Sequence, residues 1–227
     1  MRLPRILLNL LTSIRFPGSS RYWELRYRAG GDSGAGSYGA EADYKAEFLN
    51  HCIAQYSISS AMDFGCGDGN QLQKLKIARY LGFDVSRASI QRCRASYASD
   101  SSKQFRTLDE YSDETADAAL SLDVLYHLVE DDVFDAYLDR LFRAAERMVI
   151  IYAIDREETR SIHGRHVRYR QFTSLIAKRF QQFRLVDAPP RPPHLPHASG
   201  VGASFFVFVR EPRHVQFPVE DQPMRQA

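Results

Sequence analysis

The sequence feature that most constrains the fold is a glycine-rich turn at residues 61–70, which read Ala-Met-Asp-Phe-Gly-Cys-Gly-Asp-Gly-Asn. An apolar approach ends at Asp63 and opens directly into Gly65, Gly67 and Gly69. Because glycine has no Cβ, the backbone can turn sharply there and a ligand can touch main-chain atoms. In doubly wound sheets such a turn follows the first strand, at the edge where nucleotides bind. It therefore predicts an α/β fold with a ligand site; a purely structural turn is the alternative.

The residues around the glycines disfavour a dinucleotide. Asn70 occupies the third glycine position of the Gly-x-Gly-x-x-Gly fingerprint, and a carboxylate at Asp63 would repel a pyrophosphate. The pattern instead resembles the first motif of class I S-adenosylmethionine-dependent methyltransferases, Asp/Glu-x-Gly-x-Gly-x-Gly. This resemblance implies that Asp63 helps to hold the amino acid part of the cofactor, which lies against Gly65, Cys66 and Gly67.

A second landmark is the short apolar run that ends at Asp84, followed by Ser86 as a helix N-cap. Asp84 lies 17 residues after Gly67, close to the spacing of a ribose-binding acid at the end of a second strand. We expect its carboxylate to accept hydrogen bonds from both ribose hydroxyls; a strand-end cap is the simpler role. The resemblance adds Val85, Asp109 and Leu122 as further cofactor contacts.

The third landmark is residues 118–128, a buried-type strand that breaks into polar residues and looks like the family's fourth-strand motif. His127 is a candidate general base because histidine titrates near neutral pH, although it could equally cap the following helix. Asp123 is a second candidate catalytic residue, which could orient His127, contact the cofactor or ligate a metal. A divalent metal held by Asp123, His127 and Asp155 is a possible but less favoured arrangement.

The remaining pattern predicts a Rossmann-like three-layer αβα sandwich around a seven-stranded, mostly parallel sheet with an antiparallel last strand. Residues 130–142 have helical spacing with acids in the first turn, and 147–153 read as a buried parallel strand. A helix at 171–180 and strands at 183–188 and 203–210 would complete the sheet. The intervening residues 189–197 are too rich in proline to join a ladder.

We expect three regions: an N-terminal helical extension (1–55), the cofactor-binding domain (56–210) and a loose tail (211–227). Within the extension, helices near 22–27 and 40–54 flank a glycine-rich loop, which we interpret as a lid with Tyr38 over the cofactor or acceptor. Apolar residues at 3, 6, 7, 10, 11 and 14 form an amphipathic stripe. Packing on the domain is the simplest role for it; peripheral membrane contact and homodimer pairing are alternatives.

Composition limits the partners. The formal net charge of +2 gives no reason to expect nucleic acid as a partner. Three cysteines show no metal-ligand spacing and are too few for a disulfide framework, so they suit a cytoplasmic location. No segment reaches transmembrane length, and the N-terminus lacks a convincing signal-peptide cleavage site.

The acceptor is assigned by a weaker resemblance. Tyr126 and the alternating residues His166, Arg168 and Arg170 are candidate acceptor contacts, since alternate positions of an extended segment share a face; a solvated basic loop is the alternative. Over residues 20–210 the chain is similar to a bacterial subgroup that methylates sugars or glycan intermediates. This implies a small-molecule or glycan acceptor in polysaccharide biosynthesis, methylated on oxygen. A nitrogen, carboxylate or phosphorylated acceptor is the alternative within the class, and a non-catalytic nucleotide-binding module is the alternative outside it.

Overall fold

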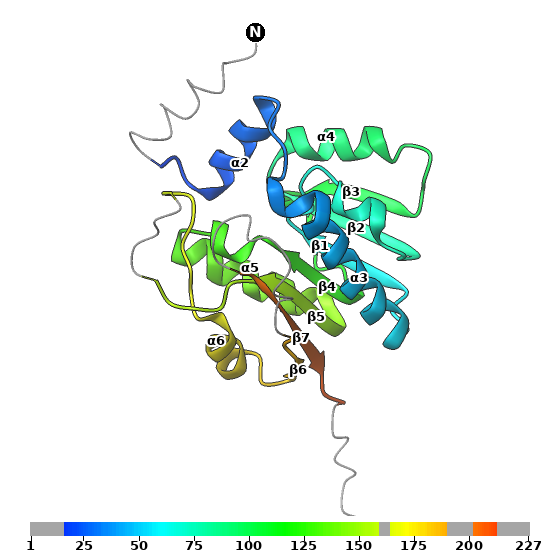
Figure 1. Ribbon diagram of the computed structural model, residues 1–227, viewed down its shortest axis with the longest axis vertical. Helices are drawn as coiled ribbons and strands as arrows, with labels where there is room; N and C mark the ends of the chain where they lie inside the picture. The colour runs from blue at the N-terminus through cyan, green and yellow to red at the C-terminus, as the bar shows by residue number, and fades with distance from the viewer. Residues whose placement is uncertain (1–15, 159–163, 190–201, 213–227) are drawn as a thin grey trace, which may run out of the picture.

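The computed structural model describes residues 16–158, 164–189 and 202–212, and it contains one seven-stranded sheet with helices on both faces (Figure 1). The strands follow the order β3-β2-β1-β4-β5-β7-β6. Strands β1 to β5 are parallel to one another, and β7 runs antiparallel to both β5 and β6. The predicted architecture, including the inserted antiparallel last strand, is confirmed.

The strands are β1 (Ser60–Phe64), β2 (Arg79–Asp84), β3 (Lys103–Thr107), β4 (Ala116–Leu122), β5 (Ala145–Ala153), β6 (Phe183–Asp187) and β7 (Ser204–Arg210). The α-helices are α2 (Ser19–Arg28), α3 (Gly39–Gln55), α4 (Arg87–Ser96), α5 (Asp131–Ala144) and α6 (Phe172–Arg179). Short 3-10 helices are η1 (Ala35–Ser37), η2 (Gln71–Lys74), η3 (Leu108–Glu110) and η4 (Leu125–His127). Where the sequence assigned a helix or strand, these bounds fall within three residues of the expected ones, except that the strand expected within 118–128 ends at Leu122 and is followed by η4.

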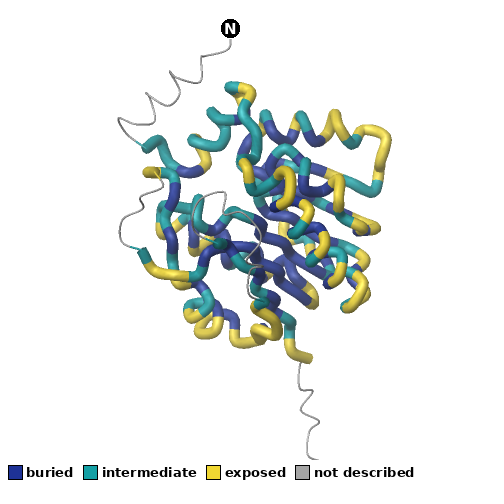
Figure 2. Tube along the Cα trace, in the orientation of Figure 1, coloured by how far each residue is buried: buried dark blue, intermediate teal, exposed yellow. Residues whose placement is uncertain are grey.

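Two apolar layers hold the helices against the sheet. On one face, Leu49 of α3 and Ile90 of α4 pack with strand residues such as Leu120 and Ile150. On the other, Leu138 of α5 and Ile176 of α6 join a second buried cluster. Alternation along the strands produces both layers, because successive side chains point to opposite faces. The buried tube segments in Figure 2 follow the central strands, so the sheet is a rigid base for its carboxyl edge.

The crossover between β1 and β2 contains no α-helix. Only η2, four residues long, connects the glycine turn to β2. Helix α3 packs beside it: the Gln71 amide donates to the Ala42 carbonyl oxygen at 3.0 Å, and Asn50 exchanges hydrogen bonds with Lys74 and Lys76. Because α3 covers this part of the sheet face, a longer crossover helix is not needed there.

Some expectations lie outside the described residues. They are the amphipathic stripe within 1–15, the proline-rich segment from 190 onward and the tail beyond 212. The three region boundaries stay a prediction. Within the described part of the chain, no helix combines the length and apolarity needed to cross a membrane.

Candidate functional site

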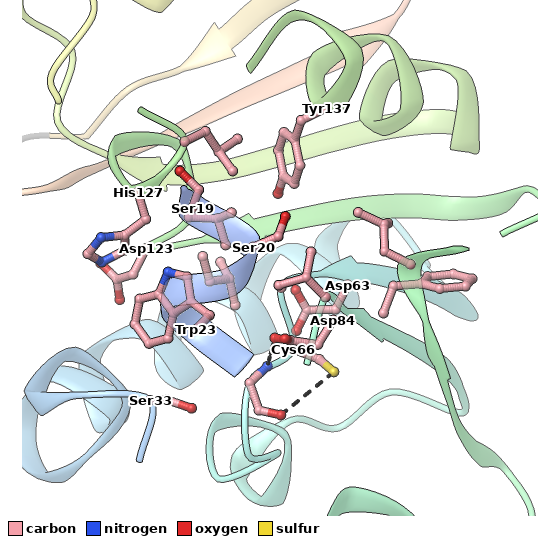
Figure 3. A pocket seen from close by; sticks show the side chains of 18 of the residues that line it. Ser19, Ser20, Trp23, Ser33, Asp63, Cys66, Asp84, Asp123, His127 and Tyr137 are labelled. Atoms are coloured by element: carbon pink, nitrogen blue, oxygen red, sulfur yellow. Dashed lines mark hydrogen bonds between the residues drawn. The ribbon is translucent and has the colours of Figure 1, made fainter. Parts of the chain in front are cut away.

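A cavity opens at the carboxyl ends of the parallel strands, beneath α2. It holds about 980 Å³ of empty space, a volume that includes the part open to solvent. Figure 3 shows Ser19, Ser20 and Trp23 of α2 facing Asp63 and Asp84 at the strand ends. This is the edge at which open α/β sheets bind ligands.

The glycine turn forms one wall of this cavity. Gly65 has a φ of 93° and Gly67 a φ of 59°, in the left-handed region that glycine adopts without steric cost. Space is also restricted, because a Cβ on Gly65 would lie 2.5 Å from Val124, and one on Gly67 would lie 2.2 Å from the Ser33 hydroxyl oxygen. The glycines therefore let two other segments close onto the turn, in addition to leaving its backbone open to a ligand.

Asp84 lies at the end of β2 and lines the cavity. Its carboxylate accepts hydrogen bonds from the Gly67 N–H at 3.0 Å and the Ser86 N–H at 2.8 Å. Burial raises the pKa of Asp84 to about 6, against the opposing effect of these two bonds. Each carboxylate oxygen can accept more than one hydrogen bond, so acceptor capacity remains for the ribose hydroxyls that the sequence predicts.

Two buried oxygen atoms at the end of the cavity formed by β1 and η2 have no hydrogen-bond donor among the described residues. Asp63 accepts a bond from the Tyr80 hydroxyl at 2.7 Å through Oδ2, which leaves Oδ1 without a partner. The amide nitrogen of Gln71 donates a hydrogen bond to the Ala42 carbonyl in α3, and its Oε1 has no partner. Buried acceptors without donors are costly, so a ligand group with several N–H donors complements this end. Burial also raises the pKa of Asp63 to about 6.

Lys45 was not foreseen from the sequence, because a single lysine in a helix gives no signal of burial. Its side chain is 1% exposed and lines the cavity, with Nζ 2.5 Å from Oδ2 of Asp123. Asp123 has a φ of 61°, unusual for a residue other than glycine, and its Oδ1 accepts a bond from the Tyr126 hydroxyl at 2.8 Å. Lys45 and Tyr126 therefore hold this carboxylate, and His127 does not.

His127 follows β4 and lines the cavity (Figure 3). Its Nδ1 lies 3.2 Å from the carbonyl oxygen of His166. A carbonyl can only accept, so Nδ1 carries the hydrogen and Nε2 is the basic nitrogen; no described residue bonds Nε2. The Trp23 ring packs edge-on at 4.9 Å. Burial lowers the pKa of His127 to about 4, so the ring is neutral at pH 7.

Helix α2 is fastened across the cavity at both ends. At its start, the N–H and hydroxyl of Ser19 donate to the Glu130 carboxylate at 2.9 and 2.5 Å. Further along, Glu24 accepts a hydrogen bond from the Ser86 hydroxyl at 2.7 Å. Arg92 of α4 donates to the Gly31 carbonyl just beyond α2 at 2.6 Å. The helix thus bridges the start of α5 and the start of α4.

The glycine-rich loop after α2 closes onto the glycine turn. Asp68 accepts hydrogen bonds from the Ser33 N–H at 3.0 Å and the Tyr38 hydroxyl at 2.6 Å, and Asn70 donates to the Ser37 carbonyl at 2.6 Å. Ser33 and Ser37 line the cavity, whereas Tyr38 is 39% exposed and lies outside it. The loop has the position of a lid, but its serines face the cavity.

The candidate acceptor contacts in residues 166–170 have protein partners. Arg168 and Arg170 lie 2.9 and 3.0 Å from the same Asp131 oxygen, and the His166 ring stacks on Tyr22 at 4.6 Å between centroids. These contacts hold the segment against α2 and the start of α5. None of the three candidates lines the cavity.

Of the remaining residues predicted to contact the cofactor or the acceptor, some line the cavity and some do not. Val85 and Leu122 line the cavity, but Tyr126 lies outside it. Asp109 is exposed and lies 3.5 Å from Arg87, and its neighbour Leu108 faces the cavity instead.

The possible metal ligands are not brought together. Asp155 accepts hydrogen bonds from the backbone N–H and the hydroxyl of Thr173 at the start of α6, and the Asp123 carboxylate is held by Lys45. Within the described residues, no group of three or more His, Cys, Asp or Glu side chains could hold a metal ion.

Comparisons with known proteins agree with this geometry. Residues 62–151 match the family described as a methyltransferase domain; no curated protein matches the chain in sequence. Among solved structures, the N-methyltransferase NodS from Bradyrhizobium japonicum WM9, in complex with S-adenosyl-L-homocysteine, is similar with a TM-score of 0.66 and 17% identity, over 85% of this chain and 98% of that one.

Two further structures show the same fold. Magnesium protoporphyrin IX methyltransferase (ChlM) from Synechocystis PCC 6803 has a TM-score of 0.56 and 16% identity, over 75% of this chain and 82% of that one. The (4+2)-cyclase SpnF also has a TM-score of 0.56 and 16% identity, over 76% of each chain. Fold similarity at this level does not fix the reaction. Residues 62–151 thus match the methyltransferase-domain family, and the seven-stranded sheet that contains them has the fold of these solved structures.

Proposed function

We propose that the protein is an S-adenosylmethionine-dependent methyltransferase that acts on an oxygen of a small polar acceptor, a saccharide hydroxyl. The observation that carries the cofactor assignment is the pair of buried acceptors without donors, Asp63 Oδ1 and Gln71 Oε1. An ammonium group supplies several N–H donors and a positive charge, which is the complement of this pair. The glycine motif and the family match point to the same ligand.

The rest of the cavity fits the other parts of this cofactor. The Lys45 ammonium, near Asp63, would hold the α-carboxylate, and Asp84 at the far side of the turn would accept the ribose hydroxyls. Leu108, Val85 and Leu122 supply apolar surface for a base. In this arrangement Asp63 faces the ammonium group of the cofactor, and Lys45 faces its carboxylate, so each charged group meets the opposite charge.

His127 would act on the acceptor. The cofactor supplies a methyl group on a positively charged sulfur, which is transferred by in-line displacement, so the protein mainly aligns the nucleophile and excludes water. We expect Nε2 of His127, which no described residue bonds, to take the proton from an acceptor hydroxyl. Trp23 and the rest of α2 cover the reacting groups and keep water out.

Cofactor binding and catalysis are tested in sequence. The single tryptophan of the chain, Trp23, lines the cavity, so its fluorescence can report binding of S-adenosylmethionine, S-adenosylhomocysteine and, as a control, NAD. We expect the first two to bind and NAD not to bind. Tight NAD binding without S-adenosylmethionine binding would overturn the cofactor assignment.

Turnover is then followed as S-adenosylhomocysteine formed with matched acceptors. The panel should pair a saccharide with its amino sugar, uronic acid and sugar phosphate, because these separate hydroxyl, amine, carboxylate and phosphorylated acceptors. A methylated hydroxyl in the product supports the proposal, and methylation only on nitrogen or carboxylate supports the alternatives. Binding without turnover on any acceptor supports a non-catalytic nucleotide-binding module.

A further inference from the structure

Two thiols meet at the backbone of the glycine turn. Cys93 of α4 approaches the carbonyl oxygen of Gly67 with its sulfur at 3.3 Å. Cys66, within the turn, approaches the same oxygen with its sulfur at 4.0 Å (Figure 3), so the two thiols lie against one carbonyl group. Both side chains are buried. The pair therefore joins the turn to the first helix after β2.

Two glycines make room for these sulfur atoms. A Cβ on Gly82 in β2 would lie 2.9 Å from the Cys66 sulfur, and a Cβ on Gly69 would lie 3.1 Å from the Cys93 sulfur. The distance at Gly82 is shorter than real Cβ contacts, so a larger residue there would displace the Cys66 thiol, and the distance at Gly69 is tight, so a larger residue there would press on the Cys93 thiol. The absence of a side chain at Gly82 and Gly69 therefore leaves the space that the two sulfur atoms occupy.

We propose that Cys66 and Cys93 are an oxidative modification site, where a hydroperoxide forms a reversible disulfide that lowers the affinity for S-adenosylmethionine. One thiolate attacks the peroxide, so the O–O bond breaks and a sulfenic acid and water form. The second thiol then attacks the sulfenic sulfur, which forms the S–S bond and releases a second water. Overall, two thiols and one hydrogen peroxide give a disulfide and two waters, and a dithiol reductant restores the thiols.

The disulfide would change the cofactor surface directly. An S–S bond is about 2.05 Å long, so the turn and α4 must move toward each other. Gly67 carries the strain, because its N–H binds Asp84 and its carbonyl accepts from Ser89 at 2.6 Å. Loss of the Asp84 contact would disturb both the turn and the proposed ribose site. This step rests on the proposed cofactor.

Access to the site depends on the cofactor. Cys66 lines the cavity, so a small peroxide can reach it from the cofactor side and a bound cofactor covers it. The neighbouring Cys93 thiol and burial raise the pKa of Cys66, which keeps the reactive thiolate scarce near pH 7. Oxidation should therefore be slow at neutral pH, faster in alkaline buffer and suppressed by S-adenosylhomocysteine.

The experiment treats the reduced full-length protein with hydrogen peroxide at pH 7 and pH 9, with and without S-adenosylhomocysteine. Intact mass and peptide mapping measure the bond, and Trp23 fluorescence measures cofactor affinity before treatment, after it and after dithiothreitol. We expect a loss of two hydrogens, a cross-linked 66–93 peptide, at least tenfold weaker binding and recovery on reduction. The reduced protein must bind S-adenosylmethionine first; failure there counts against the proposed function and not against the disulfide.

Two variants test whether the effect of peroxide comes from the Cys66–Cys93 pair or from oxidation elsewhere in the protein. Cys93→Ser keeps a hydroxyl near the Gly67 carbonyl but cannot form the bond, so its affinity after peroxide, relative to its own reduced state, should not fall. Cys52→Ser removes a buried thiol on α3 and should leave the peroxide effect intact. The absence of a 66–93 cross-link, or a cross-link with unchanged affinity, would overturn the proposal.

Discussion

Lys45 Nζ and Asp123 Oδ2 lie 2.5 Å apart and join the N-terminal helix α3 to the end of β4. The lysine side chain is 1% exposed and the aspartate 17%, so the pair is shielded from water at the floor of the cavity. Its ammonium also lies 5.4 Å from the Tyr152 ring centroid. One buried ion pair thus places both a cation and the strained Asp123 backbone beside the glycine turn.

Lys45→Met should destabilise the fold, because it keeps the apolar stem but leaves the Asp123 carboxylate with one fewer donor. Breaking a buried pair from one side costs about 3–5 kcal/mol, which urea denaturation can measure as a lower free energy of unfolding. The double variant Lys45→Met/Asp123→Asn should recover much of the loss, since Asn is neutral and tolerates a positive φ. Equal destabilisation of the single and double variants would contradict this explanation.

The exposed pair Lys74–Asp43 offers a matched control, at the same distance of 2.5 Å. Both side chains are exposed, so Lys74→Met should change the free energy of unfolding by less than about 1 kcal/mol.

Asp84→Asn should weaken S-adenosylmethionine binding by about tenfold or more, because it removes a charge-assisted pair of hydrogen bonds to the ribose. One amide oxygen remains to accept the bond from Gly67 or Ser86, so the turn should stay folded. Calorimetry measures the affinity, and Asp43→Asn serves as a surface control. An unchanged dissociation constant would reject the ribose role of Asp84.

Cofactor binding should strengthen as pH rises from 5 to 7. Burial raises the pKa of Asp63 to about 6 from an ordinary value of 3.8. The raised pKa means that the folded protein without cofactor favours a protonated Asp63. Protonation of Asp63 therefore adds to the stability of the fold near pH 4, and this contribution is lost as the pH rises through 6. A bound ammonium group favours the ionised carboxylate of Asp63 instead, so the cofactor should bind more tightly at a pH where Asp63 is already ionised.

The expected size of this effect is about tenfold in the dissociation constant between pH 5 and 7. Asp63→Asn should bind more weakly at pH 7 and show a flatter profile. Some slope should remain, because the pKa of Asp84 is also raised to about 6. A pH-independent affinity in the unmodified protein would exclude an ionised Asp63 as the ammonium partner.

The local parts of the site could be predicted from the sequence. The order of strand, glycine turn and acid at 63–69, and the spacing to Asp84, are set by residues close in the chain. Gln71 was missed because its unpaired oxygen depends on α3, which takes the amide nitrogen. Lys45 was missed for the same reason, since only the packing of α3 against β4 places it beside Asp123.

The acceptor side shows the limit of pattern reasoning. Alternation in residues 166–170 suggests three side chains aimed at a ligand, yet Arg168 and Arg170 bind Asp131 at the start of α5. That partner is more than thirty residues away in the sequence, so no local spacing reveals it. His127 could be placed from the sequence, because it follows directly after a buried strand and the carboxyl ends of such strands form the edge of the cavity. No contact with a distant residue had to be known.

His127→Ala should lower kcat by about 10²-fold or more while cofactor affinity stays within about twofold, because general bases contribute on this scale. Its lowered pKa of about 4 places the acidic limb of the rate profile below the usual histidine range. His51→Ala, at an exposed position on α3, controls for loss of a histidine. An undiminished kcat would remove His127 from the mechanism.

Asp68→Ala should loosen the lid loop. The carboxylate accepts bonds from the Ser33 N–H and the Tyr38 hydroxyl, and its own backbone N–H donates to the Ser33 hydroxyl at 2.9 Å. Loss of the carboxylate removes the two side-chain bonds to the loop, while the backbone bond to Ser33, the bond from Asn70 to Ser37 and the glycines stay in place. The cofactor should then dissociate faster, and its dissociation constant should rise by about fivefold to tenfold, since closed lids act mainly on the off-rate.

Stopped-flow measurement of Trp23 fluorescence separates this effect from a damaged pocket. A lid contact predicts a higher dissociation rate with an association rate that is unchanged or faster, because an open loop does not hinder entry. Tyr38→Phe removes only one of the bonds to Asp68 and should give a smaller change in the same direction. A slower association rate in Asp68→Ala, with dissociation unaltered, would mean that Asp68 shapes the turn itself and does not latch the loop.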